Sequence, residues 1–335
     1  MNVVREAKLY KKIKDKVQCN LCERRCLISE GEKGFCKTRV NIKGKLYTLV
    51  YGDISAIESR PIEIKPFFHF YPGSSALTFS TWSCNFACPW CQNWRLSGTE
   101  PNPERAKFVS PKEIVKKALL YGDSGLCVSF QEPTLLFEFC LQVFKLAKEK
   151  NLYNTFVSNG YMSLEALKML RDAGLDAMNI DIKGNEEVYE RYLKAKASVV
   201  WRNAREAKKL GIHVEMVNLI ITDINDGEAC ISEIVELHLK NVGEETPLHF
   251  TRYFPAYKFS NPATKIQTLE KAYEIAKKEG VLYPYLGNVP GHKYENTYCH
   301  NCGELLIKRL GYKVLKINIK NGRCPKCGEK IPIVL

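Results

Sequence analysis

Long apolar stretches are missing from this sequence. No run of about 18 apolar residues occurs in the chain, so nothing in it predicts a membrane-spanning helix. The first residues, MNVVREAKLYKKIKDK, also lack the apolar core of a secretory signal peptide. These absences argue against the membrane and secreted classes, and we expect a soluble, cytoplasmic protein that does not associate with membranes.

Acidic residues are too few to balance the basic ones at either end of the chain. Residues 1–45 carry thirteen Lys or Arg against five Asp or Glu, and residues 299–335 carry eight against two. The total of +13 therefore leaves a net charge of −1 for the residues between. Basic ends suit an acidic electron donor, RNA or an acidic protein, although ordinary solvated lysine is the simpler interpretation.

Cysteine is abundant, and its distribution argues against a disulfide framework. Eleven of the fourteen cysteines fall into three tight groups with metal-ligand spacing, in a chain without a signal peptide. The other three, Cys127, Cys140 and Cys230, lie in apolar runs and are expected to be buried thiols. We therefore predict reduced, metal-bound cysteines in a low-oxygen cytoplasm.

The central cysteine group lies in the sequence WSCNFACPWCQN, residues 82–93, which we call the Cys84 loop. It spaces Cys84, Cys88 and Cys91 as Cys-x3-Cys-x2-Cys after a strand-like apolar run. A four-iron, four-sulfur (4Fe-4S) cluster takes four cysteine ligands, so a loop of three leaves one iron with an open position. A zinc loop completed by a distant ligand is the alternative. The aromatic Trp90 and the preceding strand count against zinc.

Strand and helix patterns alternate after this loop, which predicts βα units and a parallel sheet. The predicted helices are 111–121, 135–149, 163–173, 198–210, 227–240 and 264–280. With the strand before Trp82, the predicted strands are 76–80, 126–130, 153–157, 177–181, 213–221 and 248–251. Six strands predict an α/β fold, a partial (β/α)6 TIM-like barrel that binds ligands at the carboxyl ends of its strands.

The two ends of the chain are predicted to form separate metal modules. Residues 1–18 are expected to be a basic helix, followed by short strands over 40–70 with a hairpin turn at Lys43-Gly44-Lys45. The first cysteine group can close a tetrahedral site, with zinc or an auxiliary iron-sulfur cluster as the alternatives. Its members, the N-terminal cysteines, are Cys19, Cys22, Cys26 and Cys36.

The last cysteine group forms two Cys-x2-Cys pairs separated by about twenty residues of β-type sequence, which predicts a zinc ribbon, with rubredoxin-like iron as the minority alternative. Its members, the ribbon cysteines, are Cys299, Cys302, Cys324 and Cys327. Residues 285–291 are expected to be a Gly/Pro linker before it. We therefore predict three domains: a cysteine-rich β module over 1–74, the partial barrel over 75–290, and the ribbon over 291–335.

The Cys84 loop resembles the hallmark of the radical S-adenosylmethionine (SAM) superfamily, Cys-x3-Cys-x-aromatic-Cys after the first strand of a partial barrel. Together with SFQEPT, SNGY, NIDIKG, HFTRYFP and YLGNVPG before a ribbon, it resembles the radical SAM member of the AmmeMemoRadiSam group, related to the pyruvate formate-lyase activating enzyme. The resemblance implies a 4Fe-4S cluster on the three loop cysteines, which cleaves SAM reductively to a 5'-deoxyadenosyl radical.

The resemblance also implies which residues contact SAM. Glu132 stands where the superfamily's Gly-Gly-Glu holds the SAM amino group, and Phe130 and Gln131 replace the two glycines. Further predicted SAM contacts are Ser158, Asn159, Asn179, Asp181, Trp90 and Asn93. On the substrate side the candidates are Lys183, His249 and Arg252, with a structural Asp181–Lys183 pair and local packing of the other two as alternatives.

Three functions remain open at this stage. The leading one is a radical SAM enzyme that abstracts hydrogen from an unidentified metabolite, protein or RNA, supplied with electrons by flavodoxin or ferredoxin and assisted by protein partners of the AmmeMemoRadiSam group. The second is a glycyl-radical-enzyme activating enzyme. The third is a regulator without turnover, in which iron-sulfur and zinc sites support RNA or protein binding.

Overall fold

The structure, a computed structural model, describes residues 3–335. The chain divides into two compact units that interleave along the sequence. The first comprises the chain through Arg60 together with Ser75–Met178 and Lys209–Ile212, and the second comprises Pro61–Ser74, Asn179–Lys208 and His213–Leu335. The three-domain division drawn from the sequence stays a prediction.

The N-terminal segment is built of strands, so the helix predicted over 1–18 is wrong for the described residues. Strands β2 (Tyr10–Ile13), β3 (Lys16–Cys19) and β4 (Leu27–Ile28) form one antiparallel sheet. Strands β1 (Arg5–Glu6), β6 (Lys45–Thr48) and β5 (Arg39–Ile42) form a second. The turn between β5 and β6 falls at Lys43-Gly44, which confirms the predicted hairpin.

Alternating burial explains why this basic segment adopts strands. In β3, Val17 and Cys19 are buried while the side chains between them are half-exposed, which is the period-two pattern of a strand. Lys14, between β2 and β3, has a φ of 54°, which lets the chain reverse within a tight turn. Pairing between strands therefore outweighs the helix-favouring lysines.

The central sheet confirms the α/β fold, with eight strands where six were predicted. The order is β14-β13-β12-β11-β10-β9-β8-β7. Strand β9 pairs in parallel with β8 and β10, and β13 pairs in parallel with β12 and β14. No closed barrel forms among residues 3–335, since the order runs between two different edge strands. The strands are β7 (Ala56–Pro61), β8 (Ser75–Ser80), β9 (Gly125–Val128), β10 (Tyr153–Ser158), β11 (Ala177–Asp181), β12 (His213–Ile220), β13 (Leu248–Arg252) and β14 (Pro284–Gly287).

The extra strand β14 takes up residues 285–287 of the linker predicted over 285–291, while 288–291 lie outside any strand. Its Tyr285 and Leu286 are each 1% exposed, and the strand pairs in parallel with β13. Pro284 stands at the first position of the strand, where its missing N–H does least harm to the ladder. Gly and Pro therefore bound a short buried strand here.

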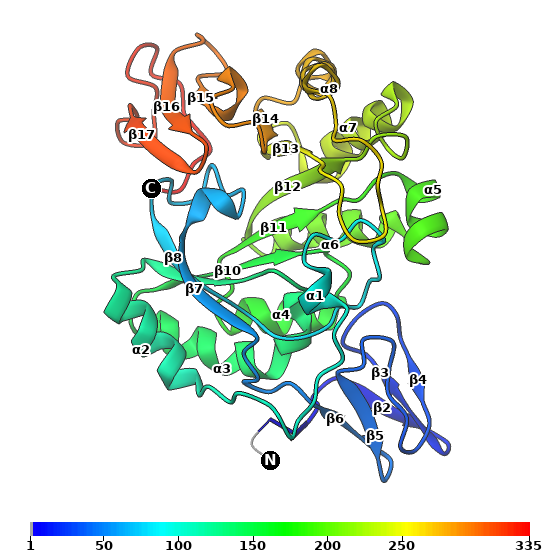
Figure 1. Ribbon diagram of the computed structural model, residues 1–335. Coiled ribbons are helices and arrows are strands. Elements are labelled where there is room, and N and C mark those ends of the chain that lie inside the picture. The colour runs from blue at the N-terminus through cyan, green and yellow to red at the C-terminus, as the bar shows by residue number, and fades with distance from the viewer. Residues whose placement is uncertain (1–2) are drawn as a thin grey trace. The chain divides into compact units, whose positions relative to one another are not determined.

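The helices of the first unit are the short α1 (Trp94–Ser97), α2 (Pro111–Tyr121), α3 (Phe137–Lys148) and α4 (Leu164–Asp172), with a 3-10 turn at Pro133–Leu136. Helix α2 packs against β8 and α3 packs against β10, with α4 beside α3, and the helices are labelled in Figure 1. A capping box between Ser110 and Glu113 begins α2, and Gly122 with a φ of 71° ends it, so its predicted bounds are confirmed.

The second unit carries the remaining helices and a small three-stranded sheet. The helices are α5 (Glu186–Val188), which continues into a π-helical turn at Tyr189–Leu193, α6 (Ala197–Lys209), α7 (Glu228–Val242) and α8 (Ile266–Glu279), with 3-10 turns at Ile62–Ile64 and Lys293–Glu295. Strands β15 (Thr297–Tyr298), β16 (Leu305–Leu310) and β17 (Lys313–Ile317) pair antiparallel. No helix in the described part of the chain has both the length and the apolarity to cross a membrane.

Candidate functional site

The Cys84 loop follows β8 and is held by aromatic anchors. Phe86 and Trp90 are 4% and 2% exposed, whereas the three loop cysteines are only partly buried. The amide N–H of Phe86 donates to the Cys84 Sγ at 3.3 Å, and Cys91 Sγ lies 3.2 Å from the hydroxyl of Ser97. The apolar side chains fix the loop while its thiols stay available as ligands.

Glu132, directly after β9, lies at the centre of a hydrogen-bonded cage. Its carboxylate accepts from the backbone and hydroxyl of Thr134, from Ser158 Oγ at 2.9 Å and from the backbone N–H of Asn159 at 2.9 Å. Burial raises the pKa of Glu132, whereas these hydrogen bonds lower it, and the net shift is upward. The structure thus brings together Glu132, Ser158 and Asn159, three of the side chains predicted to contact SAM.

Asn159 joins this cage to the Cys84 loop. Its Nδ2 donates to Asn85 Oδ1 at 2.7 Å and lies 3.8 Å from Cys84 Sγ. The same residue therefore contacts the Glu132 carboxylate through its backbone and a loop cysteine through its side chain. The strands β8 and β10 that carry these two segments both pair in parallel with β9, which places their carboxyl ends at one edge.

Gln131 is a candidate that the sequence did not reveal. Its side chain is 7% exposed, and neither its amide nitrogen nor its amide oxygen has a hydrogen-bond partner within the described residues. Buried amides without partners are rare, which makes this side chain a candidate contact for a polar ligand. The preceding Phe130 has a φ of 72°, in the region that favours glycine, which matches the glycine found there in the resembling family.

The remaining predicted contacts of the first unit divide by burial. Trp90 is almost fully buried within its loop. Asn93 is exposed at the start of α1 and makes no capping bond with its side chain. A SAM contact from either residue stays a prediction.

The predicted site residues of the second unit each have a partner inside that unit. Asn179 Nδ2 donates to the Pro66 carbonyl at 2.8 Å. Lys183 Nζ lies 2.8 Å from Asp181 Oδ2, which confirms the structural pair weighed as the alternative. Arg252 Nε donates to the Thr264 carbonyl at 2.8 Å, which is the local packing alternative.

His249 belongs to a buried network around Glu215. Its ring lies 2.7 Å from Glu215 Oε2, and the same carboxylate accepts the backbone N–H groups of Phe68 and His69. Burial by itself would raise the pKa of Glu215, but hydrogen bonds from His213 and His249 hold it well below its usual value. These contacts give His249 a packing role, and its binding to substrate stays a prediction.

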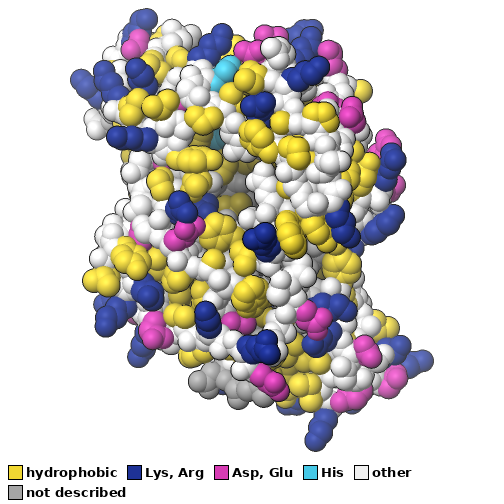
Figure 2. All heavy atoms as spheres, viewed as in Figure 1, with side chains coloured by type: hydrophobic (Ala, Val, Ile, Leu, Met, Phe, Trp, Pro, Cys, Tyr) yellow, Lys and Arg dark blue, Asp and Glu magenta, His cyan; other side chains and the backbone are white. Residues whose placement is uncertain are grey.

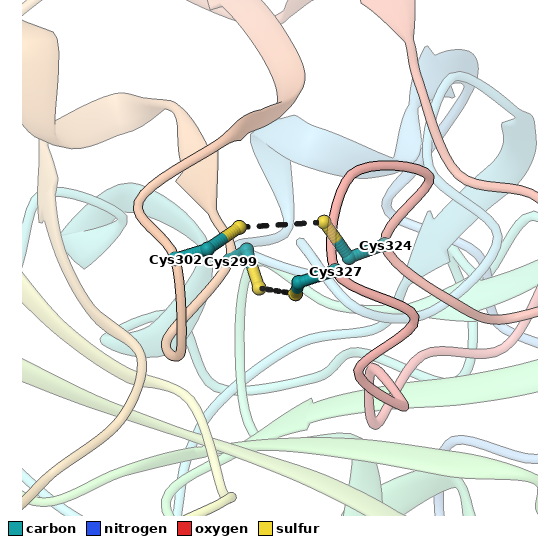
Figure 3. Close-up of side chains that lie close together, drawn as sticks. All are labelled: Cys299, Cys302, Cys324 and Cys327. Carbon is teal, nitrogen blue, oxygen red and sulfur yellow. Dashed lines mark hydrogen bonds between the residues drawn. The ribbon is translucent and has the colours of Figure 1, made fainter.

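The ribbon cysteines converge on one point, as Figure 3 shows. Their four sulfur atoms lie within 4.8 Å of one another, an arrangement able to hold a metal ion. The closest pairs are Cys299 with Cys327 at 3.6 Å and Cys302 with Cys324 at 3.7 Å. The four residues predicted as ligands are therefore brought together in an arrangement that could hold a metal, and zinc binding stays a prediction.

Known proteins share this architecture. Residues 80–238 match the family model of the Radical SAM superfamily. An uncharacterized protein of Methanocaldococcus jannaschii is 44% identical over 99% of this chain and 100% of its own length. The mitochondrial GTP 3',8-cyclase of Arabidopsis thaliana is 26% identical over 66% of this chain and 57% of its own length.

A solved structure supports the same fold. A radical SAM methyltransferase from Sphaerobacter thermophilus aligns with a TM-score of 0.53 over 85% of this chain and 78% of its own, at 13% identity. At that identity the likeness concerns the fold alone. The segment that matches the Radical SAM superfamily, residues 80–238, contains the Cys84 loop and strands β9 to β12, so the likeness to that superfamily lies in the part of the chain that carries the candidate site.

Proposed function

We propose that this protein holds a 4Fe-4S cluster on Cys84, Cys88 and Cys91 and uses it to cleave SAM. The observation that carries the proposal is the contact chain from Glu132 through Asn159 to Cys84. Through this chain, the Glu132 carboxylate, which can accept hydrogen bonds from the SAM ammonium group, is linked to the Cys84 thiol, a proposed ligand of the cluster. When bound together, the reduced cluster and SAM supply a 5'-deoxyadenosyl radical that abstracts hydrogen from substrate.

The donor set fits these groups. Three partly exposed thiols on one loop leave one iron for an outside ligand. The Glu132 carboxylate offers negative charge to the SAM amino group, and the unpartnered amide of Gln131 offers both a donor and an acceptor beside it in sequence. Buried Phe86 and Trp90 keep water from the inner side of the loop.

We place the protein in the AmmeMemoRadiSam group on its sequence elements, which include the zinc ribbon. The ribbon supports zinc because four thiolates at about 2.3 Å from one ion lie about 3.8 Å apart. The sulfur pairs at 3.6 and 3.7 Å agree with that spacing. Flavodoxin or ferredoxin is the proposed electron donor. The proposed substrate is a metabolite, a protein or RNA, and partner proteins of the AmmeMemoRadiSam group are proposed to assist.

Lys and Arg are spread over the face seen in Figure 2, interspersed with Asp and Glu. Dark-blue Lys and Arg side chains also gather at the upper left of that view, over the ribbon strands β16 and β17.

Anaerobic incubation of the reconstituted protein with SAM and dithionite tests the proposal. We expect 5'-deoxyadenosine and methionine, measured by chromatography. Cluster-loaded protein that forms neither product contradicts the proposal and favours a regulator without turnover. A glycine-centred electron paramagnetic resonance signal on a co-purified partner favours the activating-enzyme alternative, whereas a mass shift on another molecule identifies the substrate.

A further inference from the structure

We propose that the N-terminal cysteines hold an iron-sulfur cluster, a second one beside the Cys84 loop, and not a single zinc ion. All four line one small cavity within the first unit, together with Arg39 and Asn85. The metal site itself does not depend on SAM cleavage. Its role in electron supply, argued below, rests on the proposed function.

The sulfur atoms of the N-terminal cysteines are more widely separated than those of the ribbon cysteines. Among residues 3–335, the ribbon group is the only set of three or more potential ligands whose donor atoms all lie within 4.8 Å of one another. A single zinc ion needs its four sulfurs about 3.8 Å apart. A cavity walled by four separated thiols instead suits a cluster, whose iron and sulfide atoms fill the space between its cysteine ligands.

Local structure sets the thiols apart. Cys19 ends β3, and its N–H donates to the Cys26 carbonyl at 2.9 Å. Cys22 forms an isolated β-bridge with Met162. Cys36 Sγ lies 3.1 Å from the hydroxyl of Thr38. The four residues thus occupy different backbone elements around the cavity and do not form a pair of matching knuckles.

One charged side chain on the cavity wall lacks acceptors. Arg39 is 1% exposed and uses its Nη2 to bind Glu138 at 2.9 Å, but its Nε and Nη1 have no partner. Asn85 is fully buried, and its side chain lies beside the Cys22 thiol. A buried guanidinium with unsatisfied N–H groups costs free energy unless an acceptor of negative charge is present. The sulfides and thiolates of an anionic cluster supply such acceptors inside the cavity.

The cavity directly adjoins the Cys84 loop. Asn85 lines it and is the neighbour of Cys84 in sequence. Ser83 Oγ donates to the Cys36 carbonyl at 2.6 Å, and Arg24 Nε donates to the Asn85 carbonyl at 2.9 Å. A short path of one hydrogen bond and one peptide unit therefore joins Cys36 to Cys84.

This position suits single-electron transfer between two clusters. In the proposed role, the reduced N-terminal cluster gives one electron to the cluster on the Cys84 loop and returns to its oxidised state. An external one-electron donor of the flavodoxin or ferredoxin class then reduces it again. Each SAM cleavage consumes one electron, so the balance needs no further reductant.

The test uses the full-length protein with Cys84, Cys88 and Cys91 all changed to Ala, reconstituted anaerobically with iron, sulfide and zinc. We expect the variant to retain iron and acid-labile sulfide in equal amounts, about two or four of each per chain, beside the zinc of the ribbon. Retention of a second zinc with no sulfide overturns the proposal. So does protein that binds no metal beyond the ribbon zinc.

A matched pair of thiol variants controls for folding. Added to the same triple variant, Cys36→Ala is expected to remove the remaining iron, because Cys36 lines the cavity. Cys140→Ala deletes a fully buried thiol of α3, and this variant is expected to retain the iron. Equal iron loss in both variants contradicts the assignment of Cys36 as a ligand.

Magnetic coupling tests the position independently of activity. In the dithionite-reduced wild-type protein, paramagnetic resonance spectra are expected to show broadening from two neighbouring clusters. The triple variant is expected to show one isolated, unbroadened signal. Sharp, additive signals from the wild type contradict the adjacency. If the cluster is present and coupled but no 5'-deoxyadenosine forms, the proposed function fails and the metal site stands.

Discussion

The two ends of the chain each carry four cysteines, and the two groups lie on different kinds of backbone structure. The ribbon cysteines come from two matching turns, in which Gly303 and Gly328 each donate to the first cysteine of their pair at 2.9 Å. The N-terminal cysteines come from a strand end, a β-bridge and loops around a cavity. The difference teaches that two groups with the same number of cysteines can place their thiols in different arrangements, which sequence spacing alone does not distinguish.

The largest expected effect is on SAM cleavage, which should depend on the Cys84 loop and not on the ribbon cysteines. Cys88→Ala removes one of three ligands from a cluster that has no spare protein ligand, so SAM cleavage should fall below detection. Cys324→Ala should retain cleavage in the protein that remains folded. The measurement is 5'-deoxyadenosine per folded chain. Retained cleavage in Cys88→Ala would refute the cluster assignment.

The second effect concerns the stability of the ribbon. Cys324→Ala should release the ribbon metal and cost more than about 4 kcal/mol of unfolding free energy, the range associated with loss of a structural metal. Zinc content and the urea midpoint measure it. As a control, Cys230→Ala alters a partly buried thiol of α7 that lies outside all three groups and should leave the zinc content unchanged.

A third comparison uses two buried carboxylates, one in each unit. Glu132→Gln should weaken SAM cleavage by about 1.5–3 kcal/mol, since it removes a charged acceptor. Glu215→Gln should leave cleavage per folded chain unchanged while lowering stability, because it uncouples the N–H groups of Phe68 and His69. Rates at saturating and limiting SAM, with urea midpoints, distinguish the two. Equal effects on cleavage would show that both carboxylates serve the site.

Acid should weaken the second unit through two buried histidines. Burial lowers the pKa of His69 to about 4 and that of His238 to about 3. Because unfolding restores a pKa of about 6.5, the unfolded chain binds more protons below that pH. Unfolding free energy should therefore fall as pH drops from about 6.5 to 4, by about 3 kcal/mol for each ring.

Urea titrations across this range measure the slope. In His238→Gln, whose amide can still donate to the Thr246 carbonyl, part of the slope should disappear. An unchanged slope in that variant would mean that His238 is already protonated in the folded protein.

The smallest expected effect concerns the Asp181–Lys183 pair. The side chains are 27% and 15% exposed, so Lys183→Met should cost about 1 kcal/mol or less. If the pair is structural, cleavage of SAM stays at the wild-type rate. A large loss of cleavage with unchanged stability would restore the substrate-side role predicted for Lys183.

Much of the first unit could be predicted from the sequence because local signals there agree with tertiary packing. Ser110 and Gly122 bound α2 as capping rules require. The Cys84 loop and the Glu132 and Ser158 positions follow strands with clear apolar runs. Their meeting could be predicted as well, since β8, β9 and β10 are parallel neighbours.

The failures arose where long-range pairing outweighs local preference. Lysines suggested a helix over 1–18, yet burial of Val17 and Cys19 against other strands selects β3. Gly287, Pro290 and Gly291 suggested a linker, but Tyr285 and Leu286 at its start enter the core. The unpartnered amide of Gln131 leaves no sign in a single sequence, because hydrogen-bond satisfaction depends on neighbours brought in by the fold.

The Glu215 network also constrains the order of folding. The segment Pro61–Ser74 precedes most of the second unit in sequence, yet its Phe68 binds Glu215 and its His69 ring lies 2.8 Å from the Pro332 carbonyl. Phe70 forms a β-bridge with Val334. The His69 and Phe70 contacts therefore close loops of more than 260 residues, and they can form only after the chain has been made through residue 334.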